Sequence, residues 1–201
     1  MPLDERAAFQ RAAAWFRSTV DRVGDRWDQP GLGEWTVRDL VGHTSRSLVT
    51  VESYLDAEPG EVTVGSAVAY YVAVRQASSG PAVAERGRQA SAAMGADPAG
   101  FLAALEERVL AKVAAADDAA YVASAAGGMR LIDYLPTRTF ELVVHTADLA
   151  VALGVETSPP ADAETSALRL AADLAREQGS GVDVLLALTG RRPLAPGFSL
   201  L

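Results

Sequence analysis

The chain of 201 residues contains no cysteine, a single lysine and only two histidines. Without cysteine it can form no disulfide and offers no thiolate to a metal cluster, so any thiol chemistry must use a thiol supplied from outside. A formal net charge of −8 leaves no basic excess to neutralise phosphates, which argues against nucleic acid as a partner. One lysine against seventeen arginines, with abundant alanine, suggests a GC-rich genome.

Long apolar runs are also missing from the sequence. The longest, from Ala67 to Val74, is far shorter than the ~20 residues that span a bilayer. The N-terminus is charged and carries no apolar stretch, so we expect no signal peptide, no membrane partner and a cytoplasmic location. Hydrophobic residues make up 49% and charged residues 22% of the chain, which indicates an ordinary globular protein with one main domain.

Apolar periodicity and helix breakers predict an all-α protein. Thr36, followed three residues later by Asp39, has the pattern of a helix N-cap, and Asp97-Pro98 has that of a second helix start. The predicted helices span about 4–27, 36–56, part of 62–74, 97 onward, 135–154, 162–178 and 182–189. Four long helices favour a bundle. Residues 1–155 are expected to form this bundle, and residues 156–201 a short helical C-terminal extension packed on it.

Both histidines lie on predicted core-facing stripes. Glu141 and His145 are four residues apart and share one helix face, while His43 follows the helix start at Thr36. Two imidazoles and one carboxylate are the donors of an open zinc site, whose fourth position can take water or a thiol. From spacing alone, a helix-surface pair of Glu141 with His145 and a core or capping role for His43 stay open.

Two further residues are candidates for catalysis. Arg138 lies one turn before Glu141 and could receive an anionic substrate group through two hydrogen bonds, or pair instead with Glu141 or Asp148. Asp148 lies one turn after His145 and could hold the imidazole through its other nitrogen, or be a solvated helix residue.

Other polar and aromatic residues around these helices have simpler interpretations. Trp27 and Trp35 flank the loop before the helix of His43 and are expected to anchor the core. Ser47 and Thr50 follow His43 along its stripe and could line a pocket or pack between helices.

The segments Trp-Thr-Val-Arg-Asp-Leu-Val-Gly-His (35–43) and Glu-Leu-Val-Val-His-Thr-Ala-Asp-Leu (141–149) together resemble the mycothiol-dependent maleylpyruvate isomerase family. The resemblance runs from the first helix to about Gly154, and residues 187–194 are also similar. It implies a DinB-like four-helix bundle with additional short helices, in an actinobacterial protein. It further implies a zinc ion held by His43, Glu141 and His145, and mycothiol as co-substrate.

The implied activity is addition of the thiol to a small electrophile, leading either to isomerisation or to S-transfer. Only about fifty residues follow Gly154, fewer than in longer isomerase members, so contacts to a maleylpyruvate carboxylate could be missing. Arg191 and Arg192 could replace them, or lie at a solvated helix end. Alternatives are a non-catalytic metal or small-ligand binding bundle and a thiol-independent zinc hydrolase. The apolar helix faces are compatible with a homodimer, but the sequence leaves the oligomeric state open.

Overall fold

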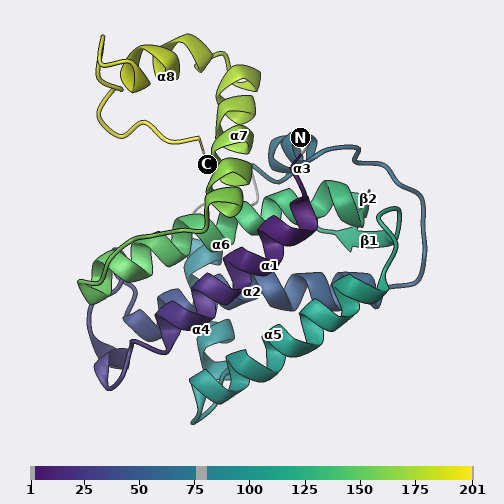
Figure 1. Cartoon of the computed structure of the whole chain (residues 1–201), viewed down its shortest axis with the longest axis vertical. Helices are drawn as coiled ribbons and strands as arrows, with labels where there is room; N and C mark the ends of the chain where they lie inside the picture. Colours follow the sequence, from purple (N-terminus) through teal and green to yellow (C-terminus); the bar gives the residue numbers. More distant parts are fainter. Residues whose placement is uncertain (1–2, 76–80, 201) are drawn as a thin grey trace.

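The computed structural model describes residues 3–75 and 81–200, without the side chains of 81–84 and 86. The chain is mostly helical, which confirms the all-α prediction (Figure 1). In order the elements are α1 (Glu5–Val20), the 3-10 turn η1 (Arg26–Asp28), α2 (Val37–Leu55), α3 (Ala67–Val74), α4 (Pro81–Ala93), α5 (Pro98–Ala115), β1 (Tyr121–Ser124), β2 (Gly127–Arg130), α6 (Leu131–Leu153), α7 (Ala161–Glu177) and α8 (Gly181–Leu188).

Four long helices form the bundle. Helix α1 packs on α6, α6 on α2, α2 on α5, and α5 back on α1, so the four close into a ring (Figure 1). Their inward stripes bury large apolar side chains such as Phe9, Phe16, Leu40, Leu105 and Leu142 almost completely. Burial of these stripes supplies the main favourable term for folding and holds α2 against α6.

The predicted helix starts at residues 36 and 97 are confirmed. Thr36 caps α2 in a reciprocal capping box, in which its side chain accepts from the Asp39 backbone N–H and the Asp39 carboxylate accepts from the Thr36 backbone N–H. Asp97 caps α5 ahead of Pro98. Because the box defines where α2 begins, it also sets the helical phase of His43, seven residues along.

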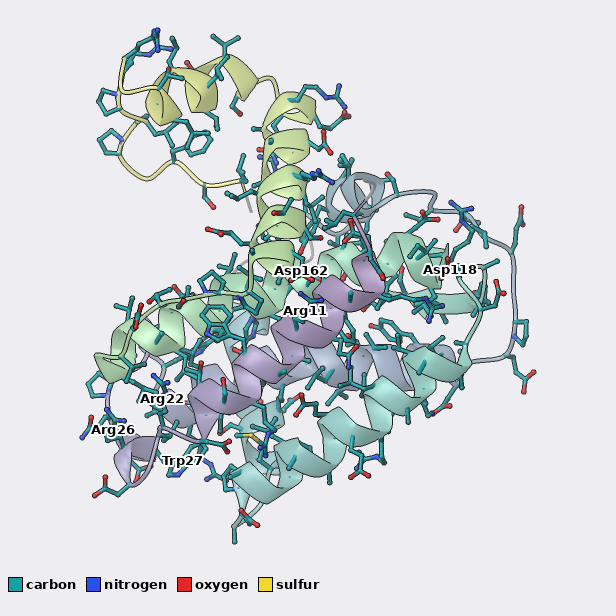
Figure 2. The ribbon with its side chains drawn as sticks, in the orientation of Figure 1. Arg11, Arg22, Arg26, Trp27, Asp118 and Asp162 are labelled. Atoms are coloured by element: carbon teal, nitrogen blue, oxygen red, sulfur yellow. The ribbon has the colours of Figure 1, made fainter. Side chains whose placement is uncertain are left out.

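The first helix is shorter than predicted. It ends at Val20 rather than near 27, and the chain continues through a turn into η1. Arg26 there donates to the Leu153 carbonyl at 2.8 Å, which ties η1 to the C-terminal end of α6. Figure 2 labels Arg22, Arg26 and Trp27 at this end of the bundle. Val23 is buried, so the apolar periodicity of the sequence continues past Val20 although the backbone there is no longer helical. This is why the helix was predicted to be longer.

A small antiparallel hairpin, β1 with β2, was not predicted. Gly127 and Gly128 are the first two residues of β2. A Cβ on Gly128 would lie 2.0 Å from the Glu61 carbonyl oxygen. Only glycine therefore lets the loop between α2 and α3 pass this close to β2. Thr63 donates its backbone N–H to the Gly128 carbonyl at 2.9 Å across the same contact.

Helix α6 begins at Leu131, four residues before the predicted start at Leu135-Pro136. The prediction placed Pro136 in the first turn, whereas it lies inside the helix. The backbone N–H groups of Leu131 and Ile132 donate to the carbonyls of Ala120 and Asp118, which satisfies two of the unpaired donors at the helix start. The predicted end is confirmed: Gly154 caps the helix in a left-handed conformation, with φ of 64°.

The C-terminal helices extend from the bundle. Helix α7 packs on α1 and α6, and Arg11 forms an ion pair with Asp162 at 3.3 Å where α7 meets α1 (Figure 2). Helix α8 packs on the far end of α7, away from the bundle (Figure 1). The tail (residues 189–200) returns to α7, where Gln178 donates to the Leu200 carbonyl at 2.8 Å. Leu201, the last residue of the predicted extension, lies outside the described residues. The division into domains at residue 155 stays a prediction. None of the helices in the described part of the chain is long and apolar enough to cross a membrane.

Candidate metal centre

His43, Glu141 and His145 lie together at the contact between α2 and α6. One possible ligand atom from each lies within 4.8 Å of the other two. Glu141 Oε2 is 3.2 Å from His145 Nε2, and the two imidazole rings meet edge to face with centroids 4.7 Å apart. Metal–ligand bonds of zinc imply separations of roughly 3.3 Å between neighbouring tetrahedral ligands. The donor types therefore suit a divalent cation, and the 3.2 Å between Glu141 and His145 matches this separation.

The position of His43 depends on two close contacts. A Cβ on Gly42 would lie 2.5 Å from the Ser91 backbone nitrogen, so the absence of a side chain at Gly42 lets α4 approach α2 next to His43. On its other side the Trp35 ring lies 4.6 Å from the His43 ring. Trp35 was expected only to anchor the core, but it also covers the imidazole.

Asp148 contacts the other nitrogen of His145. Its Oδ2 lies 3.2 Å from His145 Nδ1, while Nε2 of the same ring faces Glu141. This is the arrangement in which a carboxylate orients a metal-binding imidazole and determines which nitrogen is offered to the ion.

Two tyrosines of α3 lie beside these residues, and neither was among the residues predicted from the sequence. Tyr71 Oη donates to Glu141 Oε1 at 2.6 Å. Burial, with the charge of Glu141, raises the pKa of the Tyr71 phenol well above its usual range, so the phenol remains a donor. The neighbouring Tyr70 has its hydroxyl 3.3 Å from Arg138 Nη2. In the sequence both tyrosines belong to a short apolar run without amphipathic periodicity, which gave no signal for a site.

Arg138 is buried, with its guanidinium between the rings of Tyr70 and Tyr134, 5.3 and 5.0 Å from their centroids. Its Nε donates to Thr137 Oγ1 at 2.9 Å. With the residues that the structure describes, Arg138 makes no ion pair within 4.0 Å, so the predicted alternatives of a direct pair with Glu141 or Asp148 are wrong. A buried cation held by aromatic faces and hydroxyls keeps unused capacity for an anion.

The charges of this cluster are strongly coupled. Burial opposes ionisation of Glu141, but the hydrogen bond with His145 and the positive charge of Arg138 outweigh it and lower the Glu141 pKa to about 2. Burial likewise opposes protonation of His145, but its bonds to Asp148 and Glu141 raise its pKa to about 9. Without metal, Glu141 and His145 therefore form an ion pair at neutral pH. A metal ion must displace the imidazole proton, so its affinity should rise with pH.

This pairing predicts how the stability of the metal-free protein depends on pH. The raised pKa of His145 stabilises the fold fully below 6.5, its unfolded value, and this contribution is lost as pH rises through about 9. The lowered pKa of Glu141 stabilises the fold above 4.5, and that contribution is lost as pH falls towards about 2. The expected alkaline loss is on the order of 3 kcal/mol. Urea unfolding in the presence of a chelator, from pH 6.5 to above about 9, measures this loss of unfolding free energy. If the unfolding free energy of the wild type depended on pH as little as that of His145→Gln, the ion pair would be contradicted.

A cavity of about 550 Å³ opens beside the three donors. Arg138 and Ser47 line it, whereas Thr50 does not and instead accepts a hydrogen bond from the Tyr134 hydroxyl at 3.1 Å. Helix α7 and the tail also contribute to its wall. Among the described residues, the lining is Leu32, Trp35, His43, Arg46, Ser47, Tyr70, Tyr71, Val72, Val74, Arg75, Arg138, Glu141, His145, Leu174, Glu177, Gln178 and Leu200. Arg191 and Arg192 are not part of it, since Arg192 pairs with Asp183 and Arg191 donates to the Thr189 carbonyl.

Comparison with known proteins relates this geometry to a family. Neither the curated proteins nor the solved structures gave a match to the chain. The model of the family described as mycothiol maleylpyruvate isomerase N-terminal domain matches residues 6–150, from the start of α1 almost to the end of α6. This range is most of the chain and includes all three donors, and the protein belongs to this family.

Proposed function

We propose that the protein is a zinc-dependent enzyme that uses mycothiol to attack a small electrophilic substrate. The observation that carries the proposal is the meeting of His43, Glu141 and His145 beside a cavity, in a chain without cysteine. The family supports mycothiol as the external thiol. The cavity is within the size range of small-molecule sites.

His43, Glu141 and His145 would hold the ion. When bound, zinc lowers the pKa of an incoming thiol and so supplies a nucleophile at neutral pH. Glu141 contributes the one negative charge of the donor set, which leaves the centre cationic. Asp148, at 3.2 Å from Nδ1, keeps the His145 ring turned so that Nε2 faces the centre.

Arg138 would bind an anionic group of the second substrate. Its guanidinium lines the cavity and is held in place by Tyr70, Tyr134 and Thr137. A substrate carboxylate bound there is oriented by two N–H groups and faces the same cavity as Glu141. Arg138 thus acts by positioning the electrophile, and Asp148 by orienting His145.

Two outcomes follow once the thiol sulfur bonds to the electrophilic carbon of an activated alkene. Rotation about the former double bond and loss of the thiol give the isomer, whereas protonation of the neighbouring carbon and retention of the thiol give an S-conjugate. The choice depends on how the cavity holds the adduct. We expect the part of its wall from α7 and the tail, beyond residue 150, to influence this choice.

The test combines metal analysis with a thiol-dependence assay. Purified protein should contain about one zinc per chain, and His43→Ala should lose it, while the distant surface variant Arg108→Gln keeps it. Metal-replete protein with mycothiol should isomerise maleylpyruvate or consume thiol with an electrophile. Absence of zinc from the wild type would refute the proposal. Hydrolysis that ignores added thiol would identify a zinc hydrolase instead, and bound zinc without turnover would identify a binding protein. A cytoplasmic location and a homodimer stay predictions.

A further inference from the structure

We infer that Tyr71 restricts Glu141 to a single metal-binding oxygen, and so keeps a coordination position for the external thiol. The inference rests on the proposed metal centre and assigns to α3 a positioning residue for it. Nothing in the three-donor pattern of the sequence requires such a residue.

The two oxygens of Glu141 have different partners. Oε1 accepts the hydroxyl of Tyr71 at 2.6 Å, while Oε2 lies 3.2 Å from His145 Nε2. A hydrogen bond from a neutral hydroxyl to a carboxylate is charge-assisted and short, so Oε1 is strongly engaged. Oε2 is the oxygen that shares the centre with the imidazole.

Tyr71 is held firmly enough to impose this difference. Its side chain is buried, with its ring edge-on to Tyr70 and to Phe140 at centroid distances of 5.3 and 5.8 Å. Its hydroxyl also lies 3.3 Å from the Thr137 carbonyl, one turn before Glu141. The phenol has one hydrogen, and the shorter contact to the charged acceptor is the stronger one. The hydroxyl therefore stays on Oε1.

The consequence concerns the coordination number. A carboxylate that offers both oxygens occupies two positions around a cation, and with two imidazoles this fills four. A carboxylate that offers one oxygen leaves three protein donors, the number typical of catalytic zinc sites with an exchangeable position. Tyr71 thus favours an open centre over a closed one, and the same α3 places Tyr70 next to Arg138.

The test is Tyr71→Phe, which keeps the buried ring and removes only the hydroxyl. In Co²⁺-loaded protein we expect its visible absorption to weaken relative to the wild type. The second carboxylate oxygen, together with a bound water, would raise the coordination number to five, and the intensity falls as that number rises above four. Affinity for an added thiol, followed by its sulfur-to-cobalt charge-transfer band, should fall about 10-fold. Tyr121→Phe is the matched control, since it removes a tyrosine hydroxyl on β1, outside the cavity, and should retain the wild-type spectrum.

A wild-type spectrum and thiol affinity in Tyr71→Phe would overturn the inference while leaving the metal centre intact. Failure of the wild type to bind Co²⁺ stoichiometrically would instead refute the centre itself, and the role of Tyr71 with it.

A measurement on the wild type alone gives a second test, independent of how the variant folds. The infrared carboxylate stretches that change on zinc binding should have the wide separation of a one-oxygen ligand, and a narrow separation would contradict the role of Tyr71.

Discussion

Replacement of Glu141 by glutamine is expected to abolish stoichiometric metal binding and to reduce thiol-dependent turnover to background. The amide has nearly the same shape but no charge. Two imidazoles and an amide would leave both charges of a divalent ion uncompensated, in a half-buried centre where the positive charge of Arg138 also acts on residue 141. The affinity should fall by more than the roughly 10- to 100-fold that loss of an outer hydrogen-bond partner costs. Zinc competition with a chromophoric chelator measures it.

The same variant should be less stable without metal, by about 3 kcal/mol near neutral pH, because His145 and Arg138 lose the anion between them. Glu52→Gln is the matched control. It removes a carboxylate that pairs at 2.9 Å with exposed Arg108, and such surface pairs contribute little, about 0–1 kcal/mol. Metal binding by Glu52→Gln should equal that of the wild type. Wild-type zinc affinity in Glu141→Gln would show that the carboxylate is not a ligand.

The features that sequence alone located are those with local causes. Thr36 and Asp39 form a capping box within four residues, so the start of α2 and the phase of His43 follow from the chain itself. Glu141 and His145 share a face because a helix repeats every 3.6 residues. His43 lies beside them only because α2 packs on α6. The resemblance to the family implied this packing, and the structure has it.

The features that sequence missed depend on contacts between distant segments. Tyr71 reaches Glu141 across seventy positions, and its short helix α3 carries no amphipathic pattern that would assign it a face. The start of α6 was misplaced because Pro136 usually marks a first turn, whereas carbonyls of the segment before the hairpin cap the earlier start. The environment of Arg138 arises from rings on α3 and α6 together. The apolar periodicity of a sequence does not predict such tertiary contacts.

The residues that line the cavity extend further along the chain than the family match does. The match covers residues 6–150, but Leu174, Glu177, Gln178 and Leu200 also line the cavity. The donors thus lie within the part that the family shares, while part of the cavity wall comes from residues beyond it. Arg191 and Arg192, the candidates for substrate contacts in that part, both lie outside the cavity wall. An anionic substrate would have to find its cation among the arginines that line the cavity, which include Arg46, Arg75 and Arg138.

Arg138→Met should therefore separate substrate binding from folding. We expect thiol-dependent conversion of a carboxylate-bearing electrophile to fall about 100-fold, since a charge-assisted pair at a fixed position is lost. Stability should fall by less than in Glu141→Gln, because methionine fills a similar space, although Glu141 loses the positive charge that helps to lower its pKa. Steady-state kinetics and urea unfolding measure the two quantities.

An uncharged electrophile of similar shape is the internal control for this variant. Its conversion should hardly change in Arg138→Met, because it never used the guanidinium, and Arg108→Gln should leave both substrates unaffected. Arg138→Lys should recover only part of the lost rate, since an ammonium keeps the charge but not the planar guanidinium near the Tyr70 and Tyr134 rings. Equal losses for charged and uncharged substrates would instead mean that Arg138 acts on the metal centre through Glu141, whose pKa its charge already lowers.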